Sequence, residues 1–222
     1  MIAATSPTTP PPSVEADSRA LGVLSIQRTC VHDGPGAGFF EDFLYVPAYF
    51  NGDAPFGTWA ATEAFVTASW ADSAEVPHAN DFALLEMEDQ NGMTIADVTG
   101  KIAFRADSLA DNHLTLLGYP TNLDGGEEMH QVTTGDFVDL EDGTVAYGSD
   151  MGGGSSGGPW IQNFNRKAEG QGGGRNRARL AVVGVASYGF TNPGIRAQGA
   201  SILTRDFRVL RRDACSANQG NC

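Results

Sequence analysis

The chain has 222 residues and a hydrophobic content of 41%, enough for one large or two small folded cores. No apolar run approaches the roughly 20 residues that a membrane-spanning helix requires, so we expect no membrane partner. The formal net charge is −13 but unevenly placed: residues 1–160 hold 4 basic and 24 acidic side chains, and residues 161–222 hold 10 and 3.

The basic C-terminal part is interpreted most simply as packing against an acidic part of the same chain. A nucleic-acid surface is the less favoured alternative, because neither interleaved aromatic residues nor a binding motif accompanies the arginines. These are Arg175, Arg177, Arg179, Arg205, Arg208, Arg211 and Arg212.

The first 19 residues are expected to form a disordered tail. They carry four prolines among Ser and Thr, a composition that buries too little surface to offset the ordering entropy. A basic start and an apolar middle are both missing, so no secretion signal is visible.

Short apolar runs separated by turn residues occupy most of the rest. They predict strands at 43–50, 64–70, 82–87, 101–104, 114–119, 144–147, 160–164 and 180–190, and residues 20–29 offer one more strand. Many short strands with frequent turn signals favour an all-β sandwich or barrel. Helical spacing is convincing once, at Leu203, Phe207 and Leu210 within Ile202–Arg212, after a plausible Thr204 cap.

The segment Asp150–Trp160, DMGGGSSGGPW, carries the clearest chemical signal. A serine among glycines lets the backbone turn sharply and brings N–H groups beside an attacked carbonyl. Ser156 is therefore the predicted nucleophile, and the N–H groups of Gly154 and Ser156 are the predicted oxyanion hole. A plain Gly/Ser linker is less favoured, because linkers seldom run directly into a strand. The α/β-hydrolase elbow is excluded because all four histidines precede Ser156, whereas in those enzymes the histidine follows the serine.

Several segments in order resemble the chymotrypsin/trypsin-like serine peptidases. Gly154–Pro159 is similar to their nucleophile motif, with Ser155 where most members have Asp, as in the glutamyl-endopeptidase-like branch. Asp81–Leu85 looks like the triad-aspartate motif, and VPAYFNGDAPFGTW within Tyr45–Trp70 looks like the same branch. Val185–Gly189 resembles the strand that flanks the substrate, and Gly199–Ile202 the last strand. The resemblance covers about Cys30 to Arg212, and five motifs in sequence make it specific.

The resemblance implies two antiparallel, six-stranded-type β-barrels, the first of them incomplete, with a short C-terminal helix. The expected divisions are a partial first barrel at 20–110, a second barrel at 111–202, the helix at 203–212 and a tail at 213–222. The implied protein is an extracellular monomer that acts on polypeptides and needs no cofactor. No metal site is predicted, because the histidines and cysteines lack ligand spacing.

One element of the resembling family is missing from this sequence, the catalytic histidine that acts as the base. In the family a histidine directly precedes a cysteine, whereas here Thr29 precedes Cys30. His32 is a weak candidate for a substitute base, and His78 a weaker one. The family also has a cysteine before this one, about sixteen residues earlier, and this chain has none before Cys30. Both absences indicate a lost hairpin in the first barrel.

Two further expectations concern cysteines and the substrate pocket. A disulfide between Cys215 and Cys222 could close a small C-terminal loop, which would leave Cys30 unpaired. By resemblance, Asp150 would pair with a basic substrate side chain, or else cap a turn. Ser187, Tyr188 and Gly189 would line the substrate site. Acidic specificity is disfavoured, because Ala186 stands where glutamate-specific relatives carry histidine.

The predicted function is thus serine endopeptidase activity through an acyl-enzyme, with Ser156 attacking and Asp81 orienting the base. The alternative is a catalytically dead pseudo-protease that binds peptides or proteins in the same cleft.

Overall fold

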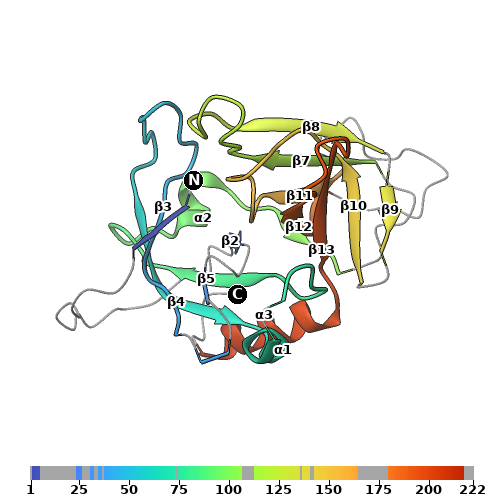
Figure 1. Ribbon diagram of the computed structural model, residues 1–222. Helices are drawn as coiled ribbons and strands as arrows, with labels where there is room; N and C mark the ends of the chain where they lie inside the picture. The colour runs from blue at the N-terminus through green and yellow to red at the C-terminus, as the bar shows by residue number, and fades with distance from the viewer. Residues whose placement is uncertain are drawn as a thin grey trace.

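The fold is mostly β, with two sheets and short helices at their edge. The computed structural model describes residues 2–5, 24–26, 31–32, 35–36, 38–73, 75–106, 113–135, 137–140, 143–164 and 180–217. Figure 1 shows the first sheet at the left and below, the second sheet at the upper right, and helices α1 and α3 together underneath. The all-β class predicted from the sequence is confirmed.

The first sheet has five antiparallel strands in the order β1-β3-β4-β5-β2. In the described residues β1 and β2 therefore lie at opposite ends of the sheet, and the expectation of an incomplete first barrel is confirmed. The strands are β1 (Ile2–Thr5), β2 (Leu24–Ile26), β3 (Glu41–Tyr45), β4 (Trp59–Val66) and β5 (Ala83–Met87).

The second sheet has eight strands in the order β8-β7-β11-β12-β13-β10-β9, and β6 pairs in parallel with β12. Its central strand β12 is the longest, and its register against β13 shifts between Ala186 and Tyr188. The strands are β6 (Ala103–Phe104), β7 (Leu114–Gly118), β8 (His130–Thr134), β9 (Phe137–Asp139), β10 (Thr144–Gly148), β11 (Pro159–Gln162), β12 (Ala181–Gly189) and β13 (Ala197–Ile202).

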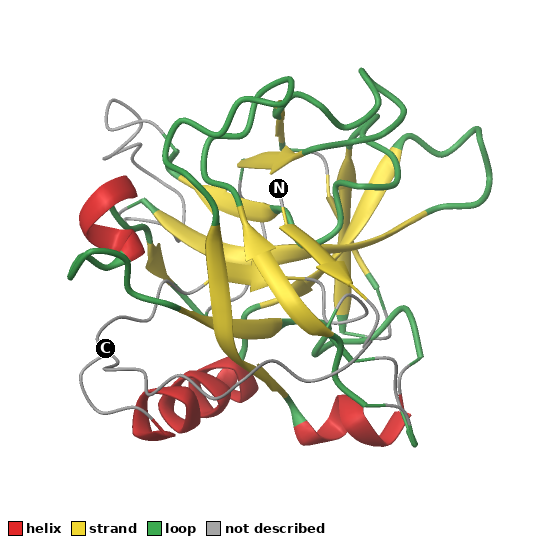
Figure 2. Cartoon of the chain, turned by 90° about the vertical axis from the view of Figure 1, so that its left-hand side faces the viewer, coloured by secondary structure: helices red, strands yellow, loops and turns green. Residues whose placement is uncertain are grey.

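Three helices are described: α1 (Ala68–Ser73), α2 (Ile95–Thr99) and α3 (Arg205–Ala217). They lie at the periphery of the strands (Figure 2). A capping box of Thr94 and Asp97 begins α2. The predicted Thr204 cap of α3 is confirmed, because the N–H of Asp206 donates to the Thr204 hydroxyl. None of these helices is long and apolar enough to span a membrane.

Strand β5 lies between the two halves of the fold, and both of its faces are buried. Phe82 and Leu84 point towards the second sheet and pack with Ile161, Val182, Val185 and the apolar face of α3. Ala83, Leu85 and Met87 point the other way, into the core of the first sheet. Asp81, two residues before this strand, is consequently held at the junction of the two halves.

Several boundaries differ from the sequence-based expectations. Ile2–Thr5, expected in a disordered tail, pair with β3. The run at 64–70 is a strand only to Val66 and then turns into α1, and the run at 43–50 ends as a strand at Tyr45. The C-terminal helix continues to Ala217, five residues beyond the expected end, because Ala214 is buried against the core shared with β5.

Candidate functional site

Asp81 is fully buried, with 0% of its surface exposed, where the two halves meet. Its backbone N–H donates to the Ser201 hydroxyl on β13 at 3.1 Å. Its carboxylate Oδ2 accepts a 2.5 Å hydrogen bond from the hydroxyl of Ser187 on β12. A buried carboxylate needs such donors, because burial without them is costly. The first-half Asp81 is thus oriented by two serines of the second half.

The loop that carries Ser156 presents this residue to solvent. Gly154 has φ +91°, and a Cβ there would stand 2.6 Å from the carbonyl oxygen of Tyr119, so only glycine fits. In the part of the chain that the structure describes, the amides of Gly154 and Ser156 donate to no protein acceptor. These two N–H groups are available to a negatively charged oxygen, as an oxyanion hole requires.

The contacts bring Ser156 and Asp81 to the same short segment of β12. The N–H of Gly157, next to Ser156, donates to the carbonyl of Ala186 at 2.8 Å. The residue after Ala186 is Ser187, whose hydroxyl is bonded to Asp81. Two residues of one strand therefore connect the predicted nucleophile and the predicted acid, although 75 positions separate them in the sequence.

A second loop, 119–128, supports the first from outside. The N–H and hydroxyl of Thr121 both donate to the carbonyl of Gly153, at 2.7 and 2.9 Å. The Asn122 side chain accepts from the N–H of Gly152 at 2.6 Å and donates to the carbonyl of Asp150 at 3.0 Å. Neither Thr121 nor Asn122 was predicted from the sequence. The Asn-Leu-Asp-Gly-Gly run signals a turn but not what that turn contacts.

The residues expected to bind substrate differ in their exposure and in their contacts. Asp150 is exposed, and Gly189 faces open space. Ser187, also expected to line the pocket, is 2% exposed, and its hydroxyl donates to Asp81. The hydroxyl of Tyr188 is hydrogen-bonded to that of Thr144 at 2.7 Å, and its ring leaves no room for a side chain at Gly199.

None of the described residues, histidines included, hydrogen-bonds to the Ser156 hydroxyl. His32 is buried, with its ring edge-on to Phe39 and its carbonyl accepting from the Trp70 indole at 3.0 Å. The Nδ1 atom of His78 accepts from the N–H of Asn80 at 3.0 Å.

Some predicted features lie outside the described residues: Thr29, Cys30, Cys222, Arg175, Arg177 and Arg179. Cys215, in α3, is disulfide-bonded.

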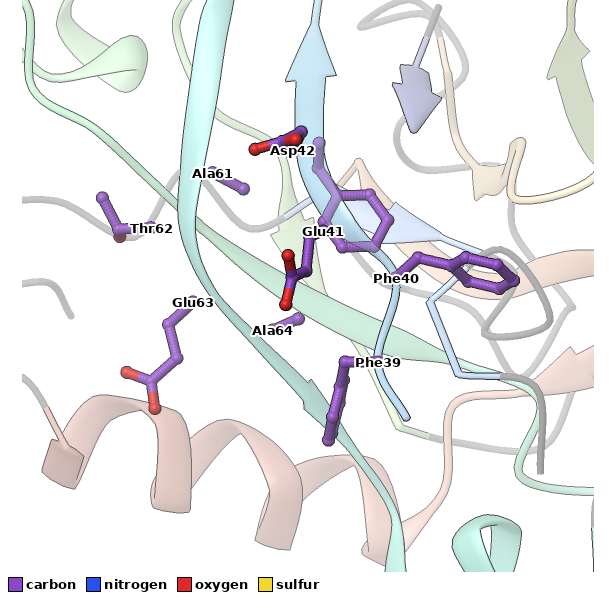
Figure 3. A pocket seen from close by; sticks show the side chains of 9 residues that line it. Phe39, Phe40, Glu41, Asp42, Ala61, Thr62, Glu63 and Ala64 are labelled. Carbon is purple, nitrogen blue, oxygen red and sulfur yellow. The ribbon is translucent and has the colours of Figure 1, made fainter. Parts of the chain in front are cut away.

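A cavity of about 310 Å³ lies between β3 and β4, where the two strands diverge after the Leu44–Ala60 pair. Phe39, Phe40, Glu41 and Asp42 line it from one side and residues 61–64 from the other (Figure 3). It contains none of the predicted site residues. Among the described residues, no group of three or more His, Cys, Asp or Glu is placed to hold a metal ion.

Comparison with known proteins finds similarity through the fold alone. No protein-family model matches the chain, and no curated protein matches it. The thermostable serine protease AL20 from an extremophilic microorganism has TM-score 0.74 and 24% identity, over 91% of this chain and 90% of that one. Protease Anisep from Arthrobacter nicotinovorans has TM-score 0.72 and 25% identity, over 90% and 87%. A Glu endopeptidase has TM-score 0.67 and 19% identity, over 89% and 83%. The chain has the fold of the trypsin-like serine proteases, as the resemblance read from its sequence predicted.

Proposed function

We propose that this chain is a serine-type peptidase that binds an extended polypeptide and forms an acyl-enzyme at Ser156. The observation that carries the proposal is the link through β12, in which Gly157 bonds to Ala186 and Ser187 bonds to Asp81. It supports a nucleophile and a buried carboxylate that flank one site. The three solved structures compared above are described as proteases or as an endopeptidase.

In this reaction the Ser156 oxygen attacks the substrate carbonyl, and the amides of Gly154 and Ser156 stabilise the resulting oxyanion. The peptide bond breaks, the amine leaves with a proton, and water hydrolyses the ester. A base has to take the serine proton, because a neutral hydroxyl is a poor nucleophile. Asp81 would orient and stabilise that base. His32 is the candidate within this chain.

Turnover is expected to be slow, because the position that holds the base in the resembling family is Thr29. Loss of a triad member typically reduces turnover by several orders of magnitude and leaves binding and oxyanion stabilisation. The same site could hold peptides without cutting them. One observation favours this second function: no described residue hydrogen-bonds to the Ser156 hydroxyl.

Specificity and location remain part of the proposal. Asp150 is exposed on the nucleophile loop, so we propose a preference for a basic substrate side chain there. The protein would act outside the cell as a monomer, as the resembling proteases imply.

The test is to restore the base. Wild type, Thr29→His and Thr29→His with Ser156→Ala are treated with a serine-directed organophosphate, and the mass added at Ser156 is followed over time. We expect slow labelling of wild type, labelling faster by about 10²-fold or more in the histidine variant, and none in the double variant. Equal, negligible labelling of both serine-containing chains would contradict the peptidase proposal. Unchanged peptide binding by Ser156→Ala would then support the binding function.

A further inference from the structure

A buried side-chain network lies directly beneath the nucleophile loop. Gln198 on β13 is 4% exposed, and Ser149 and Ser155 at the two ends of the loop are 7% and 3% exposed. The Ser149 hydroxyl donates to Gln198 Oε1 at 2.9 Å, and Gln198 Nε2 donates to the Ser155 hydroxyl at 2.5 Å. One carboxamide therefore bridges two residues that are six positions apart in the loop.

The two serines pass this connection to the loop backbone. The Ser149 hydroxyl accepts from the N–H of Met151 at 3.2 Å. The Ser155 hydroxyl donates to the carbonyl of Gly152 at 2.6 Å. The beginning, middle and end of the loop are thus tied to a single residue of β13.

The network requires a side chain with one donor end and one acceptor end. The Gly152 carbonyl can only accept, so the Ser155 hydroxyl gives its proton to that carbonyl and must accept from Gln198. Gln198 Nε2 then faces Ser155, and Oε1 is left to accept from Ser149. A carboxylate supplies no donor and a thioether supplies neither strong group, so glutamine fits this position for a chemical reason.

We propose that Gln198 is a positioning residue that sets the conformation of residues 149–156 and so aims the amides of Gly154 and Ser156. It does not touch the reacting atoms. The catalytic consequence rests on the proposed function, whereas the effect on loop conformation does not. Since buried polar networks are stable only when every member is satisfied, removing Gln198 should release the loop.

The test uses amide hydrogen exchange of the full chain, which needs no catalytic activity. Gln198→Met keeps the shape and removes both hydrogen bonds. The matched control is Gln162→Met, because Gln162 is also a buried glutamine, 2% exposed, but lies on β11. In Gln198→Met the amides of Met151 and Ser155 should exchange about tenfold faster or more. The amide of Gly157, bonded to Ala186, should change little, and the control should leave all three as in wild type.

The variant Gln198→Glu provides a second, independent experiment. It also tests the positioning role of Gln198 if Gln198→Met does not fold. A protonated carboxyl has one donor and one acceptor and can replace the carboxamide, whereas the ionised form accepts only. Burial disfavours the ionised form. Protection of Met151 and Ser155 should match wild type at low pH and fall about tenfold as the new carboxyl ionises. Protection equal to wild type at both pH values would overturn the proposal.

Organophosphate labelling separates this inference from the proposed function. If Ser156 is labelled in wild type, the labelling rate should drop in Gln198→Met and not in Gln162→Met, and an undiminished rate would count against the positioning role. If neither wild type nor Thr29→His is labelled, the peptidase proposal fails. Whenever wild type is not labelled, the exchange rates alone decide the role of Gln198.

Discussion

Replacing Gly154 with alanine tests whether the fold requires a positive φ at this position, two residues before Ser156. The φ of +91° costs a residue with a Cβ roughly 1–2 kcal/mol. The new Cβ would also stand 2.6 Å from the carbonyl oxygen of Tyr119 and 3.1 Å from Cγ2 of Thr121. Because the nearer atom is main chain, the loops must shift, which adds about 1–3 kcal/mol. We expect Gly154→Ala to lower the free energy of unfolding by about 2–5 kcal/mol.

Gly153→Ala is the matched control. A Cβ at Gly153 would meet only Oγ1 of Thr121, at 3.9 Å, and its φ is not in the left-handed region. This variant should stay within about 0.5 kcal/mol of wild type. Urea unfolding followed by tryptophan fluorescence measures both free energies. Equal stabilities of the two variants would refute the reasoning, because the turn would then be able to relax at no cost.

Three other predictions follow from the described contacts. The hydrogen bond from His130, above all, holds the pKa of the Asp124 carboxyl below its usual 3.8. Urea unfolding should therefore show Asp124→Asn less stable than wild type above pH 3.8, a difference that disappears as pH falls through the lower, folded-state pKa. The pKa of the Tyr49 phenol is raised, chiefly by its hydrogen bond to Glu127, so Glu127→Gln should lower it in an ultraviolet titration. Phe207→Ala should cost about 3–5 kcal/mol of unfolding free energy, and a loss under about 1 would mean that its core site collapses.

Prediction from the sequence was most accurate where a structural feature depends on residues that are adjacent in the chain. The glycines around Ser156 and the apolar run after Asp81 are local sequence patterns. Gly154 has the positive φ that favours glycine, and the apolar run forms the buried strand β5. The helix from Arg205 was predictable because thirteen residues are enough to show helical spacing. Helix α1 was not predicted, because six residues with only Trp70 buried show no periodicity and continue an apolar strand.

Contacts between distant polar residues could not be predicted in the same way. Gln198 and Ser155 are 43 positions apart, and Asn122 and Gly152 are 30 apart, so no spacing rule connects them. The hydrogen bond from Ser187 to Asp81 joins residues 106 positions apart, so local pattern could not predict it either.

The two halves contribute separable parts of the site, and this separation makes the restoration experiment informative. The nucleophile loop is shaped by Gln198 of β13, by Thr121 and Asn122, and by the Gly157–Ala186 bond, all within the second half. The family's base would instead follow β2, which pairs only with β5 among the described strands. A changed residue after β2 therefore leaves every described support of the loop in place. A histidine at position 29 should add a proton acceptor without altering the loop that carries Gly154 and Ser156, so a gain in Ser156 reactivity would measure the base alone.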